Sequence, residues 1–121
     1  GLNRRKEMKT PKQRLVAILQ KNIETKLESV GNLLGFTEEQ LKEFLEMASE
    51  QGLAAEIVTN AYVLNFTDEE LEEYVTLVEK LYLFEDKTKP ALVATENVIN
   101  RFIETNTVKL TEMVAANIAE Q

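Results

Sequence analysis

The chain has 121 residues, of which 44% are hydrophobic and 29% charged, and its formal net charge is −7 at pH 7. This length fits one domain, and the composition is that of an ordinary globular protein. The sequence contains no cysteine and no histidine, which excludes disulfides, thiolate metal sites and histidine-based catalysis or zinc binding. No apolar stretch approaches the roughly 18 residues that a membrane span needs, so we expect no membrane span.

The charge is distributed unevenly along the chain. Residues 1–27 carry eight basic and two acidic side chains, whereas residues 28–121 carry six basic and nineteen acidic ones. A basic arm on an acidic body can contact nucleic acid or a membrane surface, or it can screen the protein's own acidic surface. We favour screening and expect no nucleic-acid partner, because an acidic body repels phosphate.

The domain organisation that we expect is simple. Residues 1–9 are polar and charged and are interpreted as a flexible basic N-terminal arm. Residues 10–121 are expected to form a single helical domain. Because the sequence does not begin with Met, we expect a processed or trimmed product.

The first helix is predicted to begin at Thr10, the N-cap, with Pro11 in the first helical position and Gln13 completing a capping box. Gly31 and Gly35 are interpreted as the end of this helix. Apolar residues at spacings of three and four predict one inward stripe, composed of Leu15, Ile18, Leu19, Ile23, Leu27 and Val30.

The second helix is predicted over about residues 38–50. Thr37 is its N-cap, and Gln40 three residues later completes a capping box. Phe36 and Leu41 occupy the two positions of a hydrophobic staple. The residues expected to face inward are Leu41, Phe44, Leu45 and Ala48.

A short third helix is predicted over about residues 53–64, after Gly52 ends the second. The start signal then returns, because Phe66–Leu71 repeats Phe36–Leu41 30 residues later in the sequence. The repeat records either a duplication or capping chemistry that any well-capped helix shares. The inward face of the third helix is expected to comprise Leu53, Ile57, Val58 and Ala61.

The fourth helix is predicted from the Thr67 N-cap to about Phe84. A final helix is predicted from Pro90 to the end without a breaker. Asn106 falls on its apolar stripe, as either a partnered buried polar group or a point where that face meets water. The expected fold is an all-α, compact bundle of about five helices with a long C-terminal helix. The inward residues expected on the last helix are Leu92, Val98, Ile99, Phe102, Ile103, Leu110, Met113, Val114 and Ile118.

The sequence indicates no catalytic or metal chemistry. Most of the acidic residues fall in first helical turns and on outward faces, where they stabilise the helix dipole and keep the surface soluble. Ser29 and Ser49 are the only serines, and neither lies in a nucleophile elbow. We therefore expect a protein that is not an enzyme and has no cofactor, no metal and no catalytic residue.

An aromatic and apolar cluster is the remaining candidate site. The run Leu81–Phe84 cannot all face one way on a helix. The cluster either packs as core or forms an apolar groove or a subunit contact. The candidate interface or groove comprises Tyr62, Phe66, Tyr74, Leu81, Tyr82 and Phe84.

The segment Phe66–Leu71 reads Phe-Thr-Asp-Glu-Glu-Leu. With the amphipathic helix that follows, it resembles a family of small bacterial helical domains of unknown function that carry a Phe-Thr-x-Glu-Glu-Leu signature. The resemblance covers about residues 60–100, and this sequence lacks the Ser-Pro-x-Gly segment of the family. The resemblance implies an all-α fold and a periplasmic or otherwise exported location, with a cytoplasmic location left open. It implies no activity and no functional residues.

These observations lead to two main hypotheses about function, and an enzyme that uses only Glu, Lys and Tyr is a third that we place last. The first is a non-enzymatic interaction or structural module whose partner is a second copy, in a homodimer, or another protein. The second is a carrier that holds an apolar small molecule between helices. An interior cavity of about 300 Å³ or more would favour the carrier, and a flat apolar patch would favour the interaction module.

Overall fold

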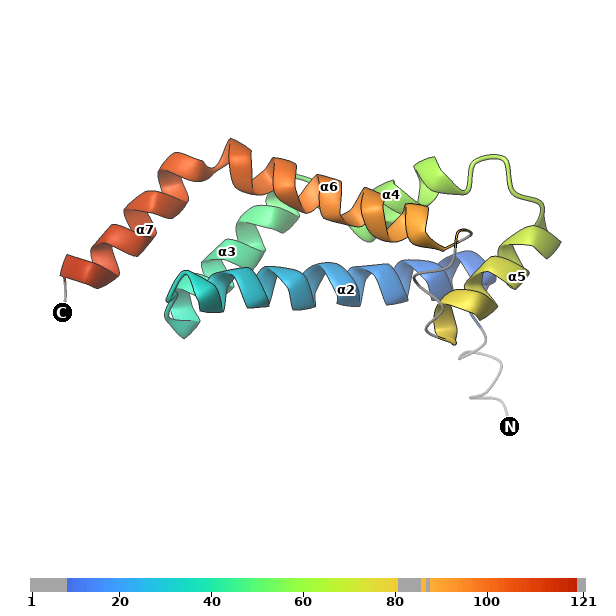
Figure 1. The fold of residues 1–121 in the computed structure, drawn as a ribbon, viewed down its shortest axis with the longest axis horizontal. Coiled ribbons are helices and arrows are strands. Elements are labelled where there is room, and N and C mark those ends of the chain that lie inside the picture. The colour runs from blue at the N-terminus through green and yellow to red at the C-terminus, as the bar shows by residue number, and fades with distance from the viewer. Residues whose placement is uncertain (1–8, 81–85, 87, 120–121) are drawn as a thin grey trace.

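The computed structural model describes residues 9–80, 86 and 88–119. The described chain is all-α, which confirms the predicted fold class. It contains no strand in these ranges and forms a bundle around one long helix (Figure 1). Of the expected N-terminal arm, residues 1–8 lie outside the described residues. The helices are α2 (Pro11–Leu33), α3 (Glu38–Glu50), α4 (Ala55–Tyr62), α5 (Asp68–Glu79), α6 (Lys89–Thr105) and α7 (Thr107–Ala119).

Helix α2 is the centre of the bundle. It contacts α3, α4, α5 and α6, and α6 lies beside it and runs in the same direction (Figure 1). The predicted stripe on α2 faces the core, with Ile18 and Val30 half-buried at its edges. The residues of this stripe that are buried are Leu15, Leu19, Ile23 and Leu27.

Three helices begin with the same capping geometry. The hydroxyl of Thr37 accepts the backbone N–H of Gln40 at 3.1 Å, and the Gln40 side chain accepts the backbone N–H of Thr37 at 3.1 Å. Thr10 makes the same reciprocal pair at the start of α2, and Thr67 makes it at the start of α5. The predicted N-caps are therefore confirmed, because each box satisfies two backbone donors that a helix start leaves open.

Gly31 does not end the first helix as predicted. The helix continues to Leu33, and Gly35, with φ of +78°, makes the turn instead. Gly31 is buried where the staple residues cross α2. A Cβ at this position would lie 2.6 Å from Leu41 Cδ1 and 3.4 Å from Phe36 Cδ2. A larger residue at position 31 would require the Leu41 side chain to move, because the staple lies close to the α2 backbone.

Helix α4 is shorter than predicted and turns a different face inward. Its first backbone N–H, from Ala55, donates to the Gln20 side chain on α2 at 3.1 Å, so a distant residue supplies the cap. Helix α4 packs between α2 and α6, which buries Val58 and Thr59. Ile57 and Ala61 were expected inward, but both are exposed, because they lie on the face away from these two neighbours.

The predicted long C-terminal helix is divided in two at Asn106. The backbone hydrogen bonds continue through this point, from Asn106 N–H to Phe102 O and from Leu110 N–H to Asn106 O. The Asn106 side chain also donates to Phe102 O at 2.7 Å. Side chains that bond to the preceding turn bend helices, so α7 turns away from the axis of α6 (Figure 1).

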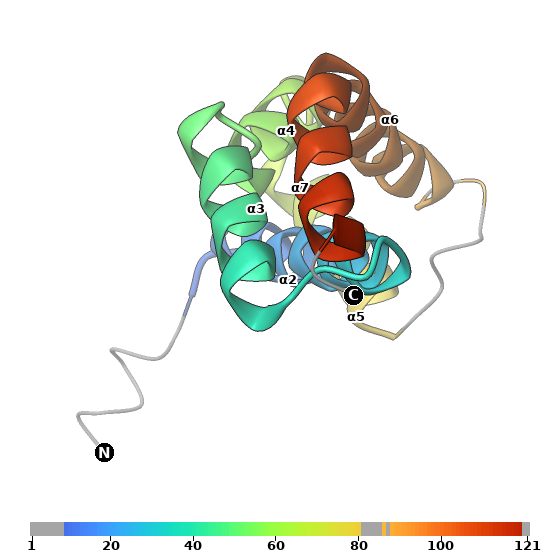
Figure 2. The same cartoon turned by 90° about the vertical axis from the view of Figure 1, so that its left-hand side faces the viewer.

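Helix α7 lies beside α3 (Figure 2), and hydrogen bonds join it to α3 and to the turn before α3. The Gln40 side chain donates to Met113 O at 3.1 Å, and the Asn117 side chain donates to Gly35 O at 3.0 Å. Leu110 and Met113 are buried. Ile118 was expected to face inward, but it is 66% exposed, because the bend carries the end of α7 past the bundle.

Helix α5 ends at Glu79, before the predicted end near Phe84. The backbone N–H of Lys80 donates to Thr76 O and closes the last turn. The sequence has no Gly or Pro at this position, so no residue type marks this end. Residues 81–84 lie outside the described residues.

Candidate functional site

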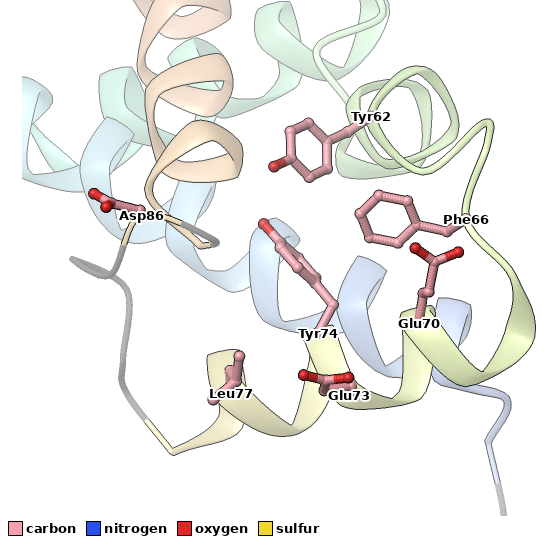
Figure 3. A pocket seen from close by; sticks show the side chains of 7 residues that line it. All are labelled: Tyr62, Phe66, Glu70, Glu73, Tyr74, Leu77 and Asp86. Carbon is pink, nitrogen blue, oxygen red and sulfur yellow. The ribbon is translucent and has the colours of Figure 1, made fainter.

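Three aromatic rings meet at the end of the bundle where α4 and α5 face each other (Figure 3). Tyr62 is the last residue of α4, Phe66 lies in the connection, and Tyr74 lies on α5. The Phe66 and Tyr74 ring centroids are 5.5 Å apart, as are those of Tyr62 and Tyr74, and Tyr62 and Phe66 are 6.0 Å apart. These separations are those of favourable aromatic pairs.

Tyr74 forms the base of this group. It is 4% exposed, and its hydroxyl donates to Thr88 O at 3.4 Å, which ties α5 to the start of α6. Burial raises the pKa of Tyr74 above its ordinary value, and the neighbouring Tyr62 raises this pKa further. The phenol therefore stays protonated and keeps its role as a hydrogen-bond donor.

The rings line a pocket of about 300 Å³ that opens to solvent. Besides the rings, its described lining includes Leu77 as an apolar wall and the carboxylates of Glu70, Glu73 and Asp86 (Figure 3). All three carboxylate residues are exposed. We call this feature the aromatic pocket, and every charged residue of its described lining is acidic.

Glu70 has two roles in this arrangement. Its carboxylate accepts the backbone N–H of Thr67 at 3.0 Å, which completes the capping box of α5. The same backbone hydrogen bond, with help from the Thr67 hydroxyl, lowers the pKa of Glu70 below its ordinary value. Glu70 therefore keeps its negative charge to a lower pH than an ordinary glutamate does.

The opposite side of α5 is fixed to α2 by one arginine. The Arg14 guanidinium donates to Glu72 at 2.9 Å and, through Nε, to Glu79 at 3.2 Å. With 3.6 residues per turn, Glu72 and Glu79 lie across α5 from Tyr74 and Leu77. The contact positions α5 without entering the pocket.

The two copies of the sequence repeat use their rings differently. In the first copy, Phe36 and Phe44 are 5.5 Å apart at an interplanar angle of 78°, and in the second copy, Phe66 and Tyr74 are 5.5 Å apart at 74°. Phe44 of the first pair packs on Phe102 in the core. Tyr74 of the second pair also belongs to the core, and Phe66, like Phe36, packs against it, but the second pair in addition borders an open pocket.

The structure brings together three of the six predicted site residues, Tyr62, Phe66 and Tyr74. The other three lie in the segment Leu81–Phe84, outside the described residues. Sequence reasoning missed the carboxylates and Leu77. For Glu70, Glu73 and Leu77 the signal was their spacing with Tyr74, which places all four on one helix face.

Other surface hollows have mixed linings. One of about 570 Å³ lies against α2 and α3 and has both apolar residues and the carboxylates Glu24 and Glu28 in its lining. Another, of about 610 Å³, lies against α2 and has both Lys12 and Glu56 in its lining. Within the described ranges, no three Asp or Glu side chains gather closely enough to hold a metal ion. None of the helices α2 to α7 combines the length and apolarity that crossing a bilayer requires.

No family model, curated protein or solved structure matches this chain. The fold and the pocket together define an all-α bundle with an aromatic, acid-rimmed surface pocket. The predicted resemblance to exported bacterial domains, and the exported location it implies, stay predictions.

Proposed function

We propose that this chain is a non-enzymatic protein-interaction module and that the aromatic pocket is its contact surface. The observation that supports this is a solvent-open pocket with three packed rings at its base and carboxylates at its rim. Protein interfaces combine an aromatic anchor region with a polar rim in this way.

The lining of the pocket favours a partner side chain over an apolar small molecule. A carrier buries its ligand in a mainly apolar cavity, whereas Glu70, Glu73 and Asp86 would have to lose water against an apolar ligand. The pocket reaches the volume of about 300 Å³ expected of a carrier, but it opens to solvent and is not an interior cavity. It suits one inserted side chain whose polar end stays near the carboxylates.

We propose a second copy of the chain as the partner. Monomers with a net charge of −7 repel one another, so a homodimer requires apolar contact together with complementary charge. The aromatic pocket offers the apolar contact. The basic residues 1–27 and the acidic residues 28–121 offer the complementary charge. Two-fold pairing is the commonest oligomer symmetry and would use both features twice.

Sedimentation velocity on the full chain tests this function. We expect a dimer that Phe66→Glu and Tyr62→Ala dissociate, since both changes disrupt the aromatic pocket. Leu64→Glu is the matched control, because Leu64 is 79% exposed, lies two residues from Phe66 and is not in the lining. Circular dichroism confirms that each variant is folded. A wild-type chain that stays monomeric at about 100 μM, where a contact of about −5.5 kcal/mol would be detected, overturns the proposed homodimer.

Native mass spectrometry separates the interaction module from the carrier. Protein purified from its own host is expected to carry no bound small molecule. A stoichiometric lipid or other apolar ligand that Phe66→Glu removes would support the carrier and contradict this proposal.

A further inference from the structure

The ring arrangement of the aromatic pocket is suited to a cation. Tyr62 and Phe66 are half-buried, so part of each ring surface remains accessible, while the buried Tyr74 supports them from below. The negative face of an aromatic ring attracts an ammonium or guanidinium group within about 6 Å of its centroid. Rings 5.5–6.0 Å apart offer such faces at one place.

The charges around the rings select the same ligand class. The described charged residues of the lining are Glu70, Glu73 and Asp86, all carboxylates. A long basic side chain would lay its methylene stem along Leu77 and the rings, with its charged end beside one of the carboxylates. A guanidinium group fits this pocket better than an ammonium group does, because it stacks on aromatic rings and forms two parallel hydrogen bonds to a carboxylate.

The chain itself contains a segment of this chemistry. Residues 1–9 carry Arg4, Arg5, Lys6 and Lys9 and a single acidic residue, Glu7. Arg4 and Arg5 are adjacent, so one of them can enter a pocket while the other contacts the surrounding acidic surface. The charge of this segment is complementary to the rim.

The geometry of α5 indicates which copy supplies the segment. Within one chain, α2 begins beside the face of α5 that carries Glu72 and Glu79, where Arg14 holds it. Tyr74 and Leu77 face the other side of α5, toward the pocket. The segment of the same chain therefore starts on the side of α5 away from the pocket and would have to pass around this helix to reach it, whereas a segment from a second copy would not.

We propose that the aromatic pocket binds the guanidinium of Arg4 or Arg5 from a second copy of the chain, in a reciprocal exchange of the basic segments. This inference rests on the proposed function, since it names the group that the interaction site recognises. The exchange also explains how an acidic chain can pair with itself: each copy covers a negative surface of the other with positive charge.

A complementation experiment on the full chain tests the exchange. One variant, Arg4→Gln with Arg5→Gln, loses the proposed ligand, and a second, Tyr62→Ala with Phe66→Ala, loses the pocket. We expect each variant alone to dissociate about ten-fold more readily than the wild type. We expect an equimolar mixture to form a heterodimer more readily than either variant, because it restores one contact. A mixture that sediments no differently from the separate variants overturns the exchange.

A peptide titration tests the chemistry of the ligand. The probe is a fluorescently labelled peptide of residues 1–12, added to the full-length Arg4→Gln, Arg5→Gln protein and followed by anisotropy. We expect binding that weakens as salt is raised, weakens several-fold when both arginines become lysines, and is lost when they become norleucines. Equal binding of the arginine and norleucine peptides overturns the cation site. If wild-type protein forms a Phe66-dependent dimer but these peptides do not bind, the interaction module stands and only the arginine assignment fails.

Discussion

The side-chain amides of Gln51 and Asn106 donate to each other, and both nitrogen-to-oxygen distances are 2.8 Å. This pair joins the end of α3 to the bend between α6 and α7. Asn106 uses the same nitrogen to bond Phe102 O. The residue that bends the C-terminal helix is therefore also the residue that ties the bend to the rest of the bundle.

The first prediction concerns the coupling of these two amides. In urea titrations, Asn106→Ala and Gln51→Ala are each expected to lower the free energy of unfolding by about 1 kcal/mol. The double variant is expected to lose less stability than the two single variants lose together, by about 0.5 kcal/mol or more, because either change alone already removes the hydrogen-bonded pair. Strictly additive losses would show that the two amides act independently.

The second prediction compares two buried threonines. Thr59 and Thr95 are both 0% exposed. The Thr59 hydroxyl has no hydrogen-bond partner among the described residues, whereas the Thr95 hydroxyl donates to Ala91 O at 2.9 Å. Valine has nearly the same shape without the hydroxyl. Thr59→Val is therefore expected to stabilise the protein by about 1 kcal/mol, and Thr95→Val to destabilise it by about 1 kcal/mol.

Thermal and urea unfolding of both valine variants check this pair. The informative result is that the two changes in the free energy of unfolding have opposite signs, since each variant serves as the control for the other. A loss of stability in Thr59→Val equal to that in Thr95→Val would contradict the assignment of an unsatisfied hydroxyl at residue 59.

The third prediction concerns the N-cap of α5. Thr67→Ala removes the oxygen that accepts the Glu70 N–H at 3.1 Å and is expected to lower the free energy of unfolding by about 1 kcal/mol. Thr67→Ser keeps that oxygen and is expected to lose much less. Urea titrations of the two variants test this prediction, and equal losses of stability would mean that the Thr67 hydroxyl does not act as a cap.

The fourth prediction concerns pH. Hydrogen bonding to Arg14 lowers the pKa of Glu79 below its ordinary value of 4.5. The unfolded chain therefore binds a proton at higher pH than the folded chain does. The stabilisation from this pair is present above about pH 4.5 and is lost as the pH falls through the folded-state pKa.

Melting temperatures between pH 6 and pH 3 test this dependence. The difference between the wild type and Glu79→Gln is expected to be largest near pH 6 and to narrow as the pH falls. Arg14→Gln is the matched control. The difference in melting temperature between the wild type and Arg14→Gln is expected to narrow in the same way, because the lowered pKa of Glu79 depends on both partners. A difference that stays constant down to pH 3 would contradict the linkage.

The features predicted from the sequence are those that depend on neighbouring residues. The N-caps at Thr10, Thr37 and Thr67 are local, because each box is closed within four residues. The apolar stripe of α2 was likewise predicted from the spacing of its residues. The close approach of Leu41 to Gly31 was not, since it arises only when α3 packs across α2.

The same distinction applies to the bend and to the pocket. The Asn106 bend depends on Gln51, a residue 55 positions away. Tyr62, Phe66 and Tyr74 were predicted as one cluster because they are close in the sequence. Asp86 was not, because its place in the lining depends on how the chain returns from α5 toward α6.

The central position of α2 also has a consequence for synthesis. A chain leaves the ribosome from its N-terminus, and its parts can fold in that order. Helix α2 is made first, and α3, α4, α5 and α6, each of which contacts it, follow in sequence. Each of these four helices therefore emerges after the helix that it contacts has already been made.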